Sequence, residues 1–156
     1  VQKGLTIGYY LFILSEILIF ASLFLAFFYN GLIPSVELGS TFLPKGIIAL
    51  DYKGVPLLNT AILFFSGLAI TSSQNYIING NKNKTVLYLI FTIVLAIIFC
   101  YFQYFEYNYA QFTLTDSVYG SSFYSITFLH FFHMIIGGLF LMVVLYKVLS
   151  NKLIND

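Results

Sequence analysis

Glu16 is the residue whose type and position most directly suggest chemistry. It lies about eleven residues into an uninterrupted apolar run, which is roughly 17 Å along a helix that rises 1.5 Å per residue. An ionisable side chain at that depth in hydrocarbon costs at least about 2.5 kcal/mol, so it is a functional-site hypothesis by default. Three interpretations stay open: a proton-relay group, a counter-ion, or a protonated carboxylic acid hydrogen-bonded to a neighbouring helix.

His130 and His133 are a second candidate pair, three residues apart in an apolar run with Thr127 one turn before them. This spacing places all three on one polar helix face, which should point into a bundle and away from lipid. A metal or haem site would need further ligands. Glu16 and Glu106 would supply them only at a shared depth, and Glu106 lies near the end of its own apolar run. The interpretation without a metal, two neutral imidazoles hydrogen-bonded across helices, is therefore favoured.

Other polar residues recur at helical spacing inside apolar runs. Asn59, Ser66 and Ser73 are seven residues apart and form a small polar stripe, while Gln103 and Glu106 share a face near the outer membrane boundary. Such stripes are typical of helix–helix packing within a membrane. By themselves, these residues indicate a membrane bundle with a buried carboxylate, without catalytic or metal-ligating residues that name a reaction.

The composition requires lipid as the surrounding solvent. Of the 156 residues, 60% are hydrophobic, 20% are aromatic and only 8% are charged, against about 25% charged in a soluble domain. Four runs, about 5–29, 57–78, 85–107 and 119–149, meet the length needed for a membrane-spanning helix. An outer-side loop at 30–56 contains all three prolines, and Pro56 suits the first position of a helix. The sequence predicts an all-α integral membrane protein, a four-helix transmembrane bundle forming a single domain over residues 1–156.

The lysines predict how the bundle is oriented. Basic residues gather at the N-terminus, at the turn around Asn79-Gly80-Asn81 and at the C-terminus, whereas acidic residues dominate the opposite side. The positive-inside rule therefore places both termini on the inside, or matrix, face. The five lysines of this inner side are Lys3, Lys82, Lys84, Lys147 and Lys152. With a net charge of +1 and no arginine, no basic surface for nucleic acid is predicted.

Several segments go further and resemble a known family. They occur in order along nearly the whole chain with their spacing kept, and together they resemble subunit III of the cytochrome c oxidase family. The matching segments are Val1–Leu5, Leu14–Glu16, Pro34–Gly39, Val55–Thr60, Glu106, Phe112–Thr113, Asp116–Ser121, and the group His130, His133, Ile135, Ile136 and Gly137.

The resemblance implies a supporting role in a larger enzyme. A subunit III holds no haem or copper itself; these are carried by partner catalytic subunits, chiefly subunit I, during dioxygen reduction and proton pumping. The family member packs against subunit I, binds phospholipids in a cleft and sustains proton uptake. Glu16 matches the family's intramembrane glutamate, and Glu106, His130 and His133 match its other polar positions. A mitochondrial inner membrane is expected, in line with the Lys- and Asn-rich composition.

This chain also departs from the family pattern. The family has seven helices, and the four runs here correspond to the third to sixth, so we expect companion chains to supply the first, second and seventh helices of a split subunit. A histidine pair of the family is replaced by Gln74-Asn75, and the basic residues that follow are lysines. Because of these replacements, the lipid-headgroup contacts that the resemblance implies are not expected to carry over unchanged.

Two alternatives to a cytochrome c oxidase subunit remain. The first is the equivalent subunit of a quinol oxidase, which differs in an electron donor that this subunit does not contact. The second is a proton-coupled transporter built around Glu16. Such a transporter predicts broken helices or inverted repeats, and neither pattern is visible in the sequence.

Overall fold

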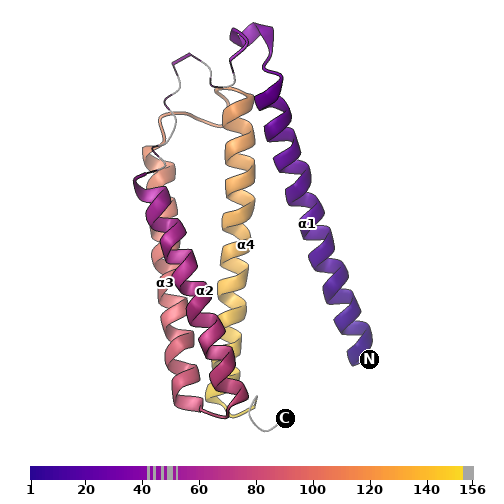
Figure 1. The fold of residues 1–156 in the computed structure, drawn as a ribbon, viewed down its shortest axis with the longest axis vertical. Coiled ribbons are helices and arrows are strands. Elements are labelled where there is room, and N and C mark those ends of the chain that lie inside the picture. The colour runs from indigo at the N-terminus through magenta and orange to yellow at the C-terminus, as the bar shows by residue number, and fades with distance from the viewer. Residues whose placement is uncertain (42, 44, 47, 49–50, 52, 153–156) are drawn as a thin grey trace. The chain divides into compact units, whose positions relative to one another are not determined.

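The protein consists of long helices joined by connections of unequal length, as a computed structural model shows for residues 1–41, 43, 45–46, 48, 51 and 53–152 (Figure 1). Four α-helices follow one another along the chain, and these described residues contain no strand. The prediction of an all-α fold is confirmed. The helices are α1 (Gln2–Leu32), α2 (Val55–Ile78), α3 (Lys82–Tyr109) and α4 (Val118–Leu149), with a short 3-10 helix η1 at Val36–Leu38.

Each of the four α-helices is long and apolar enough to cross a membrane. Most of them extend two or three residues beyond the predicted apolar runs, because a helix continues through polar residues at its ends. α2 begins at Val55, so Pro56 is its second residue and not its first. With 31 and 32 residues, α1 and α4 exceed the roughly 20 residues that span hydrocarbon, so they tilt or project beyond it. The inside location of both termini stays a prediction.

The chain divides into two compact units. The first contains Val1–Ala49 and Gln111–Leu129, and the second contains Leu50–Ala110 and His130–Asp156. α4 therefore contributes its beginning to the first unit and the remainder to the second. The expected single domain over residues 1–156 stays a prediction.

The second unit is built on the antiparallel hairpin of α2 and α3. Gly80, with φ of +74°, turns the chain, and the Asn81 N–H donates to the Tyr76 carbonyl at 2.9 Å. Across the hairpin, the buried Ser73 hydroxyl donates to the Thr85 carbonyl at 3.3 Å and fixes the register. The buried residues on the facing sides are Asn59, Ile62, Ala69 and Ser73 of α2, and Thr85, Leu89, Thr92 and Phe99 of α3. Small and hydroxyl-bearing side chains allow the two backbones to approach closely.

Lys82 ties the start of α3 to the end of α4 within the same unit. Its ammonium group donates to the Leu149 carbonyl at 3.1 Å and to the Asn151 side-chain oxygen at 2.7 Å. The last carbonyls of a helix lack intrahelical partners and carry negative partial charge. The lysine therefore caps α4 from a neighbouring helix and joins the start of α3 to the end of α4.

In the first unit, a cluster of aromatic rings packs the loop before α4 against the start of that helix. The Phe112 side chain is only 3% exposed. Its ring centroid lies 5.4 Å from that of Tyr119 and 5.3 Å from that of Phe123. The Tyr124 hydroxyl donates to the Phe112 carbonyl at 2.8 Å. The loop folds so tightly here that buried Gly120 lies directly against the Thr113 carbonyl oxygen.

Gly120→Ala is expected to destabilise the protein, because the added methyl group would overlap the Thr113 carbonyl oxygen and displace the backbone. Overpacking of this kind costs about 1–3 kcal/mol in the free energy of unfolding. The measurement is thermal unfolding of the detergent-solubilised protein. Gly8→Ala is the matched control, since no atom lies within 4 Å of a methyl group added at Gly8. Equal melting temperatures for the two variants would contradict the packing described for this loop.

Candidate functional site

Glu16 lies in the first unit, as the fifteenth of the 31 residues of α1. Its side chain is half-buried, whereas its neighbours Ser15 and Ile17 are exposed. Phe20 and Phe27 are likewise half-buried at helical spacing from Glu16, and the Phe27 ring lies 6.2 Å from Tyr119 of α4. Glu16, Phe20 and Phe27 therefore lie on the half-buried face of α1, which we call its packing stripe.

Thr127 is the other predicted polar residue of this unit. Its hydroxyl donates to the Phe123 carbonyl at 2.8 Å and lies 3.4 Å from the Tyr124 carbonyl, both in the preceding turn of α4. A threonine that bonds its own helix has satisfied its donor without a partner from elsewhere. The Thr127 hydroxyl is therefore satisfied within α4.

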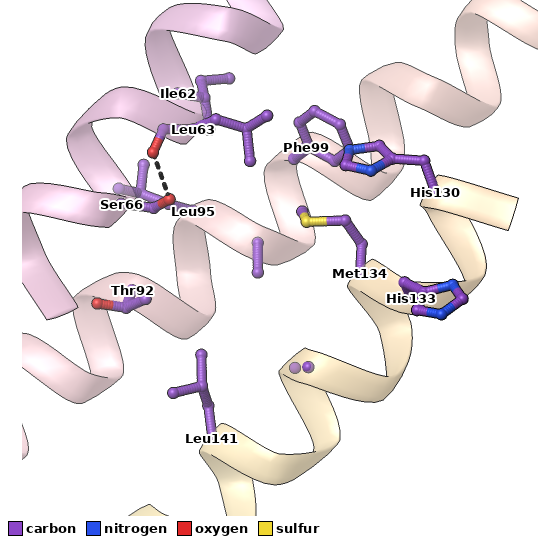
Figure 2. A pocket seen from close by; sticks show the side chains of 13 residues that line it. Ile62, Leu63, Ser66, Thr92, Leu95, Phe99, His130, His133, Met134 and Leu141 are labelled. Atoms are coloured by element: carbon purple, nitrogen blue, oxygen red, sulfur yellow. Dashed lines mark hydrogen bonds between the residues drawn. The ribbon is translucent and has the colours of Figure 1, made fainter. Parts of the chain in front are cut away.

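The second unit contains a mostly apolar pocket of about 470 Å³ between α2, α3 and α4 (Figure 2). Thr92, Leu95 and Phe99 of α3 line it, opposite Met134 and Leu141 of α4. Gly137 and Gly138 also line it, and neither has any atom within 4 Å of the place where a side chain would begin. The absent side chains of this glycine pair widen the pocket on the α4 side.

His130 and His133 both line this pocket, so the structure brings the predicted pair to one site. Figure 2 shows the His130 ring beside Phe99; the ring centroids are 6.5 Å apart and the planes meet at 83°. An edge-to-face contact of this kind is the favoured geometry for two aromatic rings. The remaining polar lining comes from Thr92 and Ser66, whose hydroxyls donate to carbonyls of their own helices.

Three further predicted residues lie toward the open end of the α2–α3 hairpin, away from the Asn79–Asn81 turn. Asn59 is only 4% exposed, and neither its oxygen nor its nitrogen has a hydrogen-bond partner within the described chain. Gln103 and Glu106 of α3 are half-buried, and the Oε1 atom of Glu106 is buried without a partner. The sequence predicted these residues as packing positions, but it gave no sign that their polar atoms would remain unpaired.

Across the described part of the chain, no three His, Cys, Asp or Glu side chains gather closely enough to hold a metal ion. The predicted role of each site residue stays a prediction. The sequence relates Lys82 to membrane orientation and to lipid headgroups, and it gives no sign that this lysine caps α4. Its bond to Leu149 joins residues 67 positions apart, so no local pattern signals it.

The long apolar helices and the polar groups placed between them define a helical integral membrane protein. The family model for cytochrome c oxidase subunit III matches residues 1–156. The chain is 54% identical over 153 residues to cytochrome c oxidase subunit 3 of Allomyces macrogynus, an overlap covering 98% of this chain and 56% of that relative. It is 48% identical over 143 residues to the Schizophyllum commune protein of the same name, covering 92% of this chain and 53% of the relative.

The Chondrus crispus cytochrome c oxidase subunit 3 is 46% identical over 153 residues, covering 98% of this chain and 56% of the relative. This chain belongs to the cytochrome c oxidase subunit III family. It spans about half the length of the curated relatives it matches. The resemblance carried by the scattered sequence segments is therefore confirmed at the level of the family.

His130→Phe and Glu16→Gln should both leave the haem absorption and copper content of the purified assembly unchanged. The phenylalanine preserves a ring beside Phe99, and the glutamine preserves the size and hydrogen-bonding capacity of Glu16. Visible spectroscopy and elemental analysis are the measurements. Loss of haem or copper from a fully assembled complex carrying either variant would show that the residue supports a metal centre.

Proposed function

We propose that this chain is a non-catalytic core subunit of a respiratory terminal oxidase, in which it supports the catalytic subunit during dioxygen reduction and proton pumping. The single observation that carries the proposal is the subunit III family match along all of residues 1–156. Subunit I and the other oxidase subunits are the proposed partners, and haem and copper belong to them. The companion chains that would supply further helices stay a prediction, which the intact mass of this polypeptide in the complex would check.

The surface of α1 supports a role within a larger membrane assembly. No residue of α1 is fully buried, and large apolar side chains such as Leu25, 72% exposed, and Phe12, 59% exposed, point outward. In hydrocarbon such a surface is compatible with lipid and with neighbouring helices alike. A helix apolar on all sides is suited to lie between several partners within the membrane.

The relatives support a mitochondrial inner membrane location and cytochrome c as the electron donor of the complex. They include proteins from Allomyces macrogynus, Triticum aestivum and Arabidopsis thaliana, each named cytochrome c oxidase subunit 3. These names favour this proposal over the equivalent subunit of a quinol oxidase and over a proton-coupled transporter. The lysine distribution supports both termini facing the matrix.

Affinity purification tests the proposed subunit role. A tag on this chain, in mitochondria solubilised with mild detergent, should recover haem absorbance, copper and cytochrome c oxidase activity together. A tag on another inner-membrane protein of similar size is the control and should recover none of them. After the complex is dissociated, the separated chain should carry neither haem nor copper. Recovery of the tagged chain free of oxidase subunits, or with a quinol oxidase, would overturn the proposal.

We further propose that a phospholipid is bound, with one acyl chain in the pocket beside His130. The mostly apolar lining extends along α4 from His130 to Leu141, about 17 Å. An elongated apolar pocket of this length suits a hydrocarbon chain.

Gly137→Leu should displace the acyl chain, because the added side chain would occupy the middle of the pocket. Gly67→Leu on α2 is the matched control: it also meets open space but lines none of the pockets described here. Lipid mass spectrometry of the purified complex should show about one phospholipid fewer per complex for Gly137→Leu and no change for Gly67→Leu. An unchanged lipid count in both variants would refute the acyl-chain assignment while leaving the subunit role intact.

A further inference from the structure

Asn59 is the most conspicuous polar side chain of the hairpin. Only 4% of its surface is exposed, so the residue is 96% buried. Both its side-chain oxygen and its side-chain nitrogen lack a hydrogen-bond partner within the described chain. A carboxamide offers two donors and one acceptor oxygen with two lone pairs. In a membrane, leaving such groups unpaired is costly because hydrocarbon supplies no substitute. An unpaired buried amide in a native structure therefore points to a bound polar molecule.

The buried hydroxyl side chains of the hairpin, Ser73, Thr85 and Thr92, do not share this condition. Ser73 donates to the Thr85 carbonyl, Thr85 to the Asn81 carbonyl at 2.9 Å, and Thr92 to the Tyr88 carbonyl at 2.9 Å. Each of these hydroxyls reaches a backbone carbonyl directly. Asn59 differs because its polar group is larger and has more hydrogen bonds to fill.

Glu106 provides the second unpaired group on the facing helix. Its Oε1 atom is buried without a hydrogen-bond partner in the described part of the chain. Glu106 follows Phe99 by seven residues on α3, so both lie on the face that packs against α2. Asn59 lies on the corresponding inward face of α2, in line with Ile62 and Ser73.

The register of the hairpin directs these two side chains toward one another. The Ser73–Thr85 bond sets Asn59 level with Phe99, so the Glu106 backbone is about 10 Å further along the helix axis. Side chains lean toward the N-terminus of their own helix, and α2 and α3 are antiparallel. Asn59 and Glu106 therefore lean toward one another, as a molecule that bridges them requires.

The start of α2 lies in the same layer. Its N-cap is Gly54, with no side-chain capping bond, and its first turn holds no acidic residue. The first N–H groups of a helix have no intrahelical partners and carry positive partial charge. By the same register, Val55 is level with Gln103, so the Glu106 carboxylate leans toward this uncapped helix end.

We propose that a buried water molecule bridges Asn59 and Glu106 beside the N-terminus of α2 and closes the open end of the hairpin. Water both donates and accepts, as this mixed set of carboxamide, carboxylate and helix N–H groups requires. A side chain from a partner subunit does not fit the role, because Asn59 is too deeply buried to receive one. By holding the Glu106 carboxylate beside the first turn of α2, the water fixes the position of that helix end relative to α3.

A map of the intact oxidase at a resolution that shows ordered waters tests the proposal directly. We expect a water within hydrogen-bond distance, about 2.6–3.2 Å, of both Asn59 and Glu106. The proposal is overturned if waters are resolved elsewhere in the membrane region but the two side chains bond each other directly, or if another subunit occupies the position.

Hydrogen exchange in the assembled complex provides a test that a merely apolar packing role would not satisfy. Asn59→Leu removes the bridge at similar size, and exchange of the Val55, Leu57 and Leu58 amides at the start of α2 should become several-fold to about tenfold faster. Pro56 between them has no amide hydrogen. Asn108→Leu, an exposed change near the same end of α3, is the matched control and should leave exchange unaltered. Unchanged exchange in Asn59→Leu would refute the bridge.

Because Asn59→Leu is expected to disturb assembly if the bridge is strong, Glu106→Gln supplies a second variant. Glutamine retains an oxygen that accepts a hydrogen bond but loses the negative charge. The water should therefore remain visible, while exchange at the start of α2 accelerates less than in Asn59→Leu. If Glu106→Gln abolishes the water, or accelerates exchange as much as Asn59→Leu, the bridging geometry is wrong.

Discussion

Hydrocarbon offers no hydrogen bonds, and this constraint governs where the polar groups of the four long helices are placed. Backbone groups meet it by forming four long helices. Hydroxyl side chains meet it by bonding carbonyls of their own helix, as Thr92 and Thr127 do, or of the neighbouring helix, as Ser73 does. Carboxamides and carboxylates have more hydrogen bonds to fill than a hydroxyl, and Asn59 and Glu106 keep unpaired atoms in the interior. The residues that the sequence analysis selects are largely polar side chains inside apolar helices, where hydrogen-bond partners are hardest to find.

Within the second unit, α2 and α3 are closely packed, whereas α4 leaves pockets beside them. α2 and α3 approach closely because small and hydroxyl side chains face one another between them. α4 is held at its end by the Lys82 ammonium group, yet beside the hairpin it leaves pockets of about 470 and 190 Å³. Both pockets are bordered by Met134 and Gly138. The larger of these pockets is the one in which we propose an acyl chain.

For a member of the subunit III family, these features are consistent with the supporting role proposed above. The pocket that holds the two histidines is mostly apolar, and His130 is accommodated there by an aromatic contact with Phe99. Glu16 lies on a packing stripe near the middle of α1. Side chains that would suggest a redox centre in isolation thus act, in the proposed function, as polar positions that fix helices beside a catalytic subunit.

The sequence by itself determined the class, the four apolar helices and the family, because helix length, breakers such as Gly80 and an ordered set of segments are local or linear properties of a chain. It also identified His130 and His133 as sharing one helix face, since three-residue spacing guarantees this. Only the tertiary structure decided that Lys82 caps α4, that Phe99 faces His130 and that Asn59 lacks a partner. These relations join residues that are distant in sequence or depend on the depth at which two helices are paired. Helix register and interhelical spacing result from the packing of whole faces, so no local pattern encodes them.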